Sequence, residues 1–379
     1  MRRCIAAAVL VAVGMSLSAC SPSMEVENQA YVLVMGIDRT EDGEIELTIR
    51  IPKIGQFESS NGGGKDEASP YLTYAVRAGS YARAIVALQV MVPRELNLSH
   101  IKLIIASERI AGRSDFRELV DQIAETPHLY NTARFIVCEG SAGDYAKRMD
   151  SVIGTRLSAE IDAWFDHCIQ QGFIPDSCFA DVYYASNSLY SDPTAAWGFM
   201  DSGEADRAAS LNLDSPMRRD AVMESPSQLF LSGAAVFRGG TLALRLDNGE
   251  TQLLNLALNQ TRSISVALAG KSYELTRAHR SKKSVSSEKN NPRVELEISL
   301  TCEDQITNGQ ASAIEAALTD SLLALVRKCQ SSKVDPFGFA ELAAGRFLTT
   351  GEWIDYDWRS RFAHAKPRIV VHAKSPAVP

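Results

Sequence analysis

Residues 31–38, Tyr-Val-Leu-Val-Met-Gly-Ile-Asp, and residues 44–51, Glu-Ile-Glu-Leu-Thr-Ile-Arg-Ile, decide how this chain begins to fold. The first stretch is rich in residues that favour strands, and the second carries leucine or isoleucine at every other position. Asp42-Gly43, between the two stretches, is a dipeptide typical of tight hairpin turns. The two stretches therefore predict an antiparallel β-hairpin at the start of a folded domain.

Strand and helix patterns alternate after this hairpin up to about residue 150. The expected elements are a strand at 71–76, a helix at 81–90 capped by Ser80, a strand at 101–106, a helix at 115–124, a strand at 132–138 and a helix at 142–149. The hairpin must be antiparallel, whereas helical connections allow parallel neighbours. A mixed sheet in an α/β or α+β domain over residues 31–150 is therefore predicted.

The remainder of the chain reads as two further domains, 151–262 and 263–379. The expected elements are a helix within 151–172, a loop-rich stretch at 175–220, a hairpin at 228–246, strands at 253–258 and 264–268, a charged loop at 279–291 between strands at 271–276 and 293–302, a helix at 311–328 and a strand at 369–372. Aromatic residues gather between 337 and 362, where we expect a core. The predicted fold class is α+β, with three consecutive domains whose mixed or antiparallel sheets are flanked by helices, behind a lipidated N-terminal tether.

Composition and charge exclude several classes of protein. The 379 residues, 45% hydrophobic and 22% charged, are those of an ordinary globular protein with two or three cores. The net charge of −7 lacks the basic footprint of nonspecific nucleic-acid binding, so no nucleic-acid partner is expected. Anionic lipid headgroups would not attract the chain as a whole either.

The amino terminus supplies a different route to a membrane. Met1-Arg2-Arg3 precedes an apolar run at 5–13 that is too short to span a bilayer and typical of a signal peptide. Leu17-Ser18-Ala19-Cys20 matches the bacterial lipobox, in which the cysteine thiol is joined to diacylglycerol. Two acyl chains hold a protein stably on a bilayer, whereas one does so only marginally. We expect a signal peptide at 1–19, covalent diacylglycerol and acyl lipid (palmitate included) at Cys20, a tether at 20–30 and an extracytoplasmic body.

Cysteine and histidine spacing provides no candidate catalytic or metal site. Cys168 and Cys178 are ten residues apart, which leaves open either a disulfide bond or two unpaired buried thiols, and their spacing fits no zinc signature. The six histidines are widely separated, and the common hydrolase, metalloprotease and dinucleotide-binding motifs do not occur. The chain is therefore expected to have no catalytic residues, no metal and no cofactor apart from the lipid at Cys20.

Five segments occur in the order and approximate spacing of one known family. They are Cys20; Met35-Gly36-Ile37-Asp38 with the acidic turn 41–44; the helix that begins at 80–85 and leads to 98–105, where His100 and Lys102 enter a hydrophobic strand; the hairpin residues Gly233-Ala-Ala-Val-Phe237; and Asp335-Pro-Phe-Gly338 with the later Trp358. This pattern resembles the Ger(x)C family, the lipoprotein C subunits of spore germinant receptors. Two departures are present: Ser21-Pro22-Ser23 stands where members have Trp-Asp, and Ala340 replaces the last glycine of the family's Asp-x-x-Gly-x-Gly segment.

The resemblance implies a three-domain α+β lipoprotein on the outer face of the spore's inner membrane. It would act without catalysis beside a membrane-spanning A subunit and a nutrient-sensing, transporter-like B subunit in nutrient-triggered germination. Of the residues that match the family, Asp38 is expected to end a strand and cap the turn, and His100 to hydrogen-bond backbone at a strand entrance. Gly36 and Asp335 are also interpreted as structural, the other interpretation of all four being contact with the A or B subunit.

Two alternatives belong to other classes of protein. A lipid-anchored extracytoplasmic solute-binding protein would have two similarly sized α/β lobes around a hinge, with one deep cleft between them. A lipid-anchored hydrolase is the third reading. The number of lobes and the presence of such a cleft separate these hypotheses.

Overall fold

The computed structural model describes residues 28–53, 69–153, 156–200, 228–268, 270–286, 288 and 291–376. The expected signal peptide and Cys20 lie outside these residues. The last part of the expected tether lies inside the fold: β1 (Gln29–Tyr31) pairs in parallel with β5 (Glu95–Asn97). Gln29 and Ala30 are buried, so the fold includes two residues that their composition had assigned to the tether.

The predicted opening hairpin is confirmed. β2 (Val34–Arg39) and β3 (Ile45–Pro52) are antiparallel neighbours, with Ile37 opposite Leu47. Gly43 in the turn has a φ of 84°, a left-handed conformation that glycine adopts without steric cost.

The strand and the helix predicted after the hairpin are also confirmed. β4 (Tyr71–Ala78) extends the sheet beside β3, and α2 (Tyr81–Met91) packs against both strands. The Ser80 hydroxyl accepts a hydrogen bond from the Arg83 amide at 3.4 Å, which makes it the predicted N-cap.

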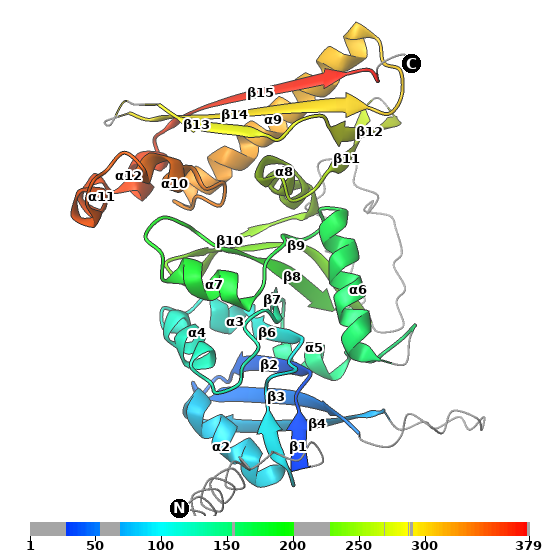
Figure 1. The fold of residues 1–379 in the computed structure, drawn as a ribbon, viewed down its shortest axis with the longest axis vertical. Helices are drawn as coiled ribbons and strands as arrows, with labels where there is room; N and C mark the ends of the chain where they lie inside the picture. The colour runs from blue at the N-terminus through cyan, green and yellow to red at the C-terminus, as the bar shows by residue number, and fades with distance from the viewer. Residues whose placement is uncertain are drawn as a thin grey trace, which may run out of the picture.

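One eight-stranded sheet forms the lower two thirds of the molecule as drawn in Figure 1. Its order is β10-β9-β8-β7-β6-β2-β3-β4, and β2, β6, β7 and β8 run parallel while both edges are antiparallel. The other strands of this sheet are β6 (Leu103–Ser107), β7 (Arg134–Cys138), β8 (Thr194–Met200), β9 (Leu229–Arg238) and β10 (Thr241–Leu246). A mixed sheet was predicted, but this one extends well beyond residue 150.

Helices cover both faces of this sheet. One face packs against α2, α4 (Phe116–Ala124) and α7 (Phe179–Ser186). The other packs against α5 (Ala142–Lys147) and α6 (Leu157–Gln170), and the short α3 (Glu108–Ala111) follows β6. Because successive strand residues point to opposite faces, neighbours such as Val34 and Met35 belong to different cores.

The expected boundary at residue 150 lies inside this continuous sheet. Ile136 of β7 pairs with Ala196 of β8, so strands assigned to two separate domains share one hydrogen-bonded array. The segment expected to be loop-rich, 175–220, contains α7 and β8 within its described part. The serine and proline residues between these elements made the whole segment resemble a loop. The short strand β8 is stabilised by its neighbours β7 and β9, which the local sequence does not reveal.

A second, five-stranded sheet forms the other end of the molecule (Figure 1). Its central strand β14 (Arg293–Cys302) pairs in parallel with β15 (Lys366–Lys374) along one edge and antiparallel with β12 (Lys271–Arg277) and β13 (Lys282–Val285) along the other, and β11 (Ser263–Leu268) continues from β12. The predicted charged loop is therefore partly wrong, since Lys282-Lys283 belongs to β13. A lysine pair on a short strand lacks the apolar alternation that would reveal it.

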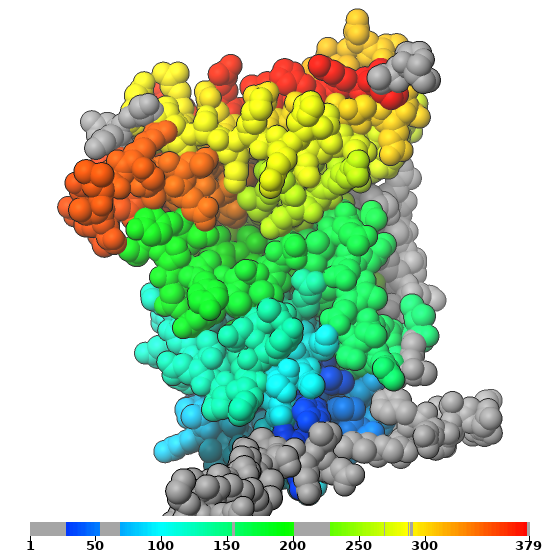
Figure 2. Space-filling view, viewed as in Figure 1, coloured from blue at the N-terminus to red at the C-terminus, as the bar shows by residue number. Residues whose placement is uncertain are grey.

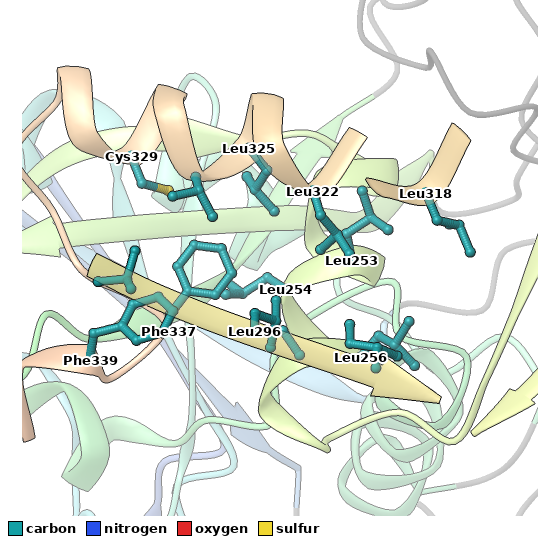
Figure 3. Close-up of a cluster of buried hydrophobic side chains, with 14 of the residues drawn as sticks. Leu253, Leu254, Leu256, Leu296, Leu318, Leu322, Leu325, Cys329, Phe337 and Phe339 are labelled. Atoms are coloured by element: carbon teal, nitrogen blue, oxygen red, sulfur yellow. The ribbon is translucent and has the colours of Figure 1, made fainter. Parts of the chain in front are cut away.

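The segment 253–258, predicted as a strand, is instead part of helix α8 (Asn248–Leu258). Asp247 and Glu250 form a reciprocal capping box at its start. Almost every residue of α8 is buried, because the helix lies between the two sheets. Buried polar residues such as Thr251, Gln252 and Asn255 interrupt the apolar stripe by which an amphipathic helix is recognised in a sequence. Figure 3 shows its leucines among side chains of α9 and β14.

The long helix predicted at 311–328 is confirmed as α9 (Asn308–Ser331), with Leu318, Leu322 and Leu325 facing the core. It is followed by α10 (Phe339–Ala344), α11 (Thr350–Tyr356) and α12 (Trp358–Phe362). The aromatic residues of this region are buried in the same core, as predicted. Cys168 and Cys178 are free thiols, as in the second of the two alternatives, although only Cys168 is buried and Cys178 is half-buried. The α+β fold class is confirmed.

Candidate functional site

Gly36 and Asp38 act together at the carboxyl end of β2. The Asp38 carboxylate accepts hydrogen bonds from the amides of Ala142 at 2.9 Å and Gly143 at 2.7 Å, and from the Ser141 hydroxyl at 3.2 Å. It therefore holds the first turn of α5. The prediction that Asp38 caps the hairpin turn is wrong. Residues two apart in a strand point to the same face, so Asp38 shares its face with Gly36, and that face lies under α5.

Gly36 allows α5 to rest directly on the strand backbone. A Cβ atom at this position would lie 2.6 Å from the carbonyl oxygen of Ala142, which is backbone and cannot rotate away. Gly36→Ala is therefore expected to lower the free energy of unfolding by about 1–3 kcal/mol, the usual cost of overpacking. Urea denaturation measures this loss. Gly79→Ala is the matched control, since nothing lies within 4 Å of its Cβ, and an equal loss in both variants would contradict the argument.

His100 has a different role from the one predicted. Its ring packs edge-on against Tyr31, with 4.6 Å between ring centroids, and it is exposed at the entrance to the strand β6. The contact joins the beginning of the described chain to the segment that follows β5. His100 thus supports the position of β1 through ring packing, not through the expected backbone hydrogen bond.

Asp335 lies at the junction between the two sheets, in the segment between α9 and α10. It is 2% exposed, and its Oδ2 accepts hydrogen bonds from the amide of Ala340 at 2.6 Å and from the indole nitrogen of Trp358 at 3.1 Å. Its own amide donates to Oδ2 of Asp192 at 2.8 Å. The buried carboxylate of Asp335 thus orients α10 and α12, while its backbone amide binds the carboxylate of Asp192 in the segment before β8.

Asp192 extends this cluster across the molecule. It is buried, stands just before β8, and its Oδ1 accepts an ion-paired hydrogen bond from Arg359 of α12 at 2.6 Å. The residue was missed in the sequence, because Asp192-Pro193 in a serine-containing stretch resembles an ordinary turn. No local pattern indicates that its partners lie 143 and 167 residues further along the chain.

The electrostatics of the junction depend on burial. Burial raises the pKa of Asp335 to about 6, and nearby Asp192 adds to this rise, while hydrogen bonds from Ala340, Trp358 and the Phe339 amide oppose it. The Oδ1 atom of Asp335 has no hydrogen-bond partner among the described residues. Lys283 donates to the carbonyl of Phe337, and burial lowers the pKa of its ammonium group, opposed by the charges of Asp335 and Glu341.

A small hollow of about 170 Å³ adjoins this cluster, lined in part by Tyr190, Asp192, Trp353 and Trp358. Its lining brings the buried Asp192 carboxylate and two buried indole rings together with the partly exposed guanidinium of Arg359. Among the residues that the structure describes, no three His, Cys, Asp or Glu side chains form a group that could hold a metal ion. In the same residues, no helix is both long and apolar enough to cross a bilayer. The predicted lipid site, Cys20, lies outside them.

Comparison with known proteins extends over almost the whole chain. Residues 22–196 match a family described as the spore germination protein N-terminal domain, and residues 232–374 match one described as spore germination B3/GerAC like, C-terminal. Spore germination protein KC of Bacillus subtilis (strain 168) is 20% identical over 97% of this chain and 93% of its own length.

A solved structure shows the same fold. The crystal structure of the GerBC protein aligns with a TM-score of 0.54 over 90% of this chain and 96% of its own, at 13% sequence identity. The two family matches together include the Asp38 and Asp335 clusters. The chain belongs to the Ger(x)C family of spore germination proteins.

Proposed function

We propose that this chain is the non-catalytic lipoprotein C subunit of a spore germinant receptor. The two family matches, which together extend from residue 22 to residue 374, carry the proposal. In this role the protein is held by diacylglycerol at Cys20 on the outer face of the spore's inner membrane. It works beside the membrane-embedded A and B subunits and is required for germination in response to nutrients.

The architecture favours this role over that of a solute-binding protein. A solute-binding protein needs two similar α/β lobes around a hinge. Here an eight-stranded sheet faces a five-stranded sheet, and α8 is buried between them. The junction is closed by buried Asp192 and Asp335 together with the partly exposed Arg359, which suits a relay of position between subunits better than a hinge that opens for a nutrient.

The lipid anchor is tested by Cys20→Ala. The variant lacks the thiol that accepts diacylglycerol, so we expect it to leave the membrane fraction of spores and to slow germination in nutrients. Fractionation followed by immunoblotting measures the first effect, and loss of spore refractility measures the second. Cys4→Ala is the matched control, because Cys4 lies in the expected leader and should leave both readouts unchanged. Unchanged membrane fractionation of Cys20→Ala would refute the anchor.

A further inference from the structure

The outer face of α2 is apolar although it faces solvent. Its inner face buries Tyr81, Ala84 and Leu88 against the sheet. On the outer face Val86 is 59% exposed and Val90 is 84% exposed, with Met91 exposed beside them. A surface helix ordinarily carries charged or polar residues on this side.

Basic residues lie on this face and at the end of the helix, where exposed Glu95 is the acidic residue that follows Arg94. Arg83 is the one charged residue of α2, and it lies on the exposed side. A hollow of about 420 Å³ adjoins the end of the helix and is lined by Leu72, Pro93 and the two basic residues Lys53 and Arg94, with no acidic residue in its lining. The whole chain has a net charge of −7, so this basic and apolar combination differs from the average surface. Such a combination is typical of segments that lie on anionic bilayers.

The first described residues of the chain lie at this same surface. β1 (Gln29–Tyr31) pairs with β5 (Glu95–Asn97), the strand that follows α2 in the sequence. The residues of β1 also line the hollow. Cys20 is eight residues before Asn28, and eight residues of extended chain reach at most about 29 Å. In Figure 1 α2 and β1 lie at the end of the molecule opposite the five-stranded sheet. Figure 2 shows that the long axis of the molecule runs between these two ends.

We propose that Val86, Val90 and Met91, together with Arg83, Lys53 and Arg94, form a surface that rests on an anionic lipid bilayer. The inference rests on the proposed lipid anchor at Cys20, because the short tether keeps the local lipid concentration high enough for a weak apolar contact to persist. The contact orients the molecule. Its eight-stranded sheet is proximal to the membrane, and the Asp335 junction and five-stranded sheet project away from it, toward the extracytoplasmic parts of neighbouring subunits.

The experiment uses the full lipidated chain in vesicles of phosphatidylglycerol and phosphatidylethanolamine. A single environment-sensitive fluorophore is attached at Val90→Cys, and vesicle lipids carrying doxyl quenchers report contact with the bilayer. Leu348→Cys is the matched control, since Leu348 is 94% exposed and lies in the C-terminal part. The unsubstituted chain measures background labelling of half-buried Cys178. We expect at least twofold quenching at position 90, none at position 348, and weaker quenching at position 90 in phosphatidylcholine vesicles.

Flotation of the same vesicles separates the two hypotheses. A chain that floats with the vesicles but shows no more quenching at position 90 than at position 348 overturns the lipid-contact surface and leaves the anchor intact. A chain that does not float overturns the anchor, and this inference with it. If the A and B subunits are added and position 90 becomes shielded from a water-soluble quencher without contact with quencher lipids, the surface binds a subunit and the lipid proposal is wrong.

Discussion

Replacing Arg50 with methionine is expected to lower the free energy of unfolding by about 3–5 kcal/mol, because several backbone carbonyl oxygens lose their donor at about 1–3 kcal/mol each and half-exposed Asp150 loses its ion-pair partner. Arg50 is 1% exposed on β3, beneath the end of α5. Its Nη1 donates to the carbonyl oxygens of Ala146 at 3.2 Å and Lys147 at 3.1 Å, and also to that of Met149. Its Nη2 lies 2.6 Å from a carboxylate oxygen of Asp150. Methionine fills similar space but leaves these acceptors without a donor.

Arg77→Met on the neighbouring strand β4 is the matched control. Its Nε pairs with Glu46 at 3.0 Å, but both groups are in contact with water. Exposed ion pairs contribute at most about 1 kcal/mol, so the control should unfold at nearly the denaturant concentration of the unsubstituted protein. Guanidinium denaturation followed by circular dichroism measures both variants. Equal losses would show that Arg50 contributes no more than a surface arginine.

The second large effect is expected for Asp335→Ala, which should lower the free energy of unfolding by about 2–4 kcal/mol. The substitution removes the acceptor of two buried donors, the Ala340 amide and the Trp358 indole nitrogen. Neither donor can turn to water, because Ala340 and Trp358 are themselves buried. Asp355→Ala is the control, since Asp355 is exposed in the same region, and surface substitutions change stability by about 0.5 kcal/mol or less.

The pH dependence of this carboxyl has a definite sign. Its ordinary pKa of 3.8 applies to the unfolded chain, and burial raises the pKa to about 6 in the folded protein. Between these values the folded state retains a proton that the unfolded chain releases, so the contribution to stability falls as pH rises from about 4 to about 6. The loss is about 1.4 kcal/mol for each unit of pKa difference.

Asp335→Asn isolates this contribution, because the amide oxygen can still accept both hydrogen bonds while the ionisation is removed. The difference in free energy of unfolding between the unsubstituted protein and Asp335→Asn, measured from pH 4 to pH 7, should decrease with pH. A difference that is constant or increases with pH would contradict a raised pKa. Other titrating groups are common to both proteins and cancel in the comparison.

Local pattern was sufficient where an element carries a clear apolar stripe or alternation and where a turn or cap has a distinctive sequence. The opening hairpin, α2 with its Ser80 cap, and α9 were all predicted for this reason. Local pattern failed for α8, whose buried polar residues interrupt the stripe, and for β13, whose lysines lack alternation. The role of Asp38 was also predicted wrongly, because its hydrogen-bond donors lie at the start of a helix more than one hundred residues later.

By itself the sequence determined the α+β class, most of the elements around the opening hairpin, the expectation of a lipid at Cys20 and the resemblance to the Ger(x)C family. These follow from short-range periodicity, turn chemistry and ordered motifs, all of which can be read within a few tens of residues. Only the tertiary structure decided that eight strands on both sides of residue 150 form one sheet, and that Asp192, Asp335 and Arg359 close the junction with the second sheet. Strand pairing and buried polar contacts depend on which distant segments meet, and the energy of that choice lies in the packed interior, not in any local stretch of sequence.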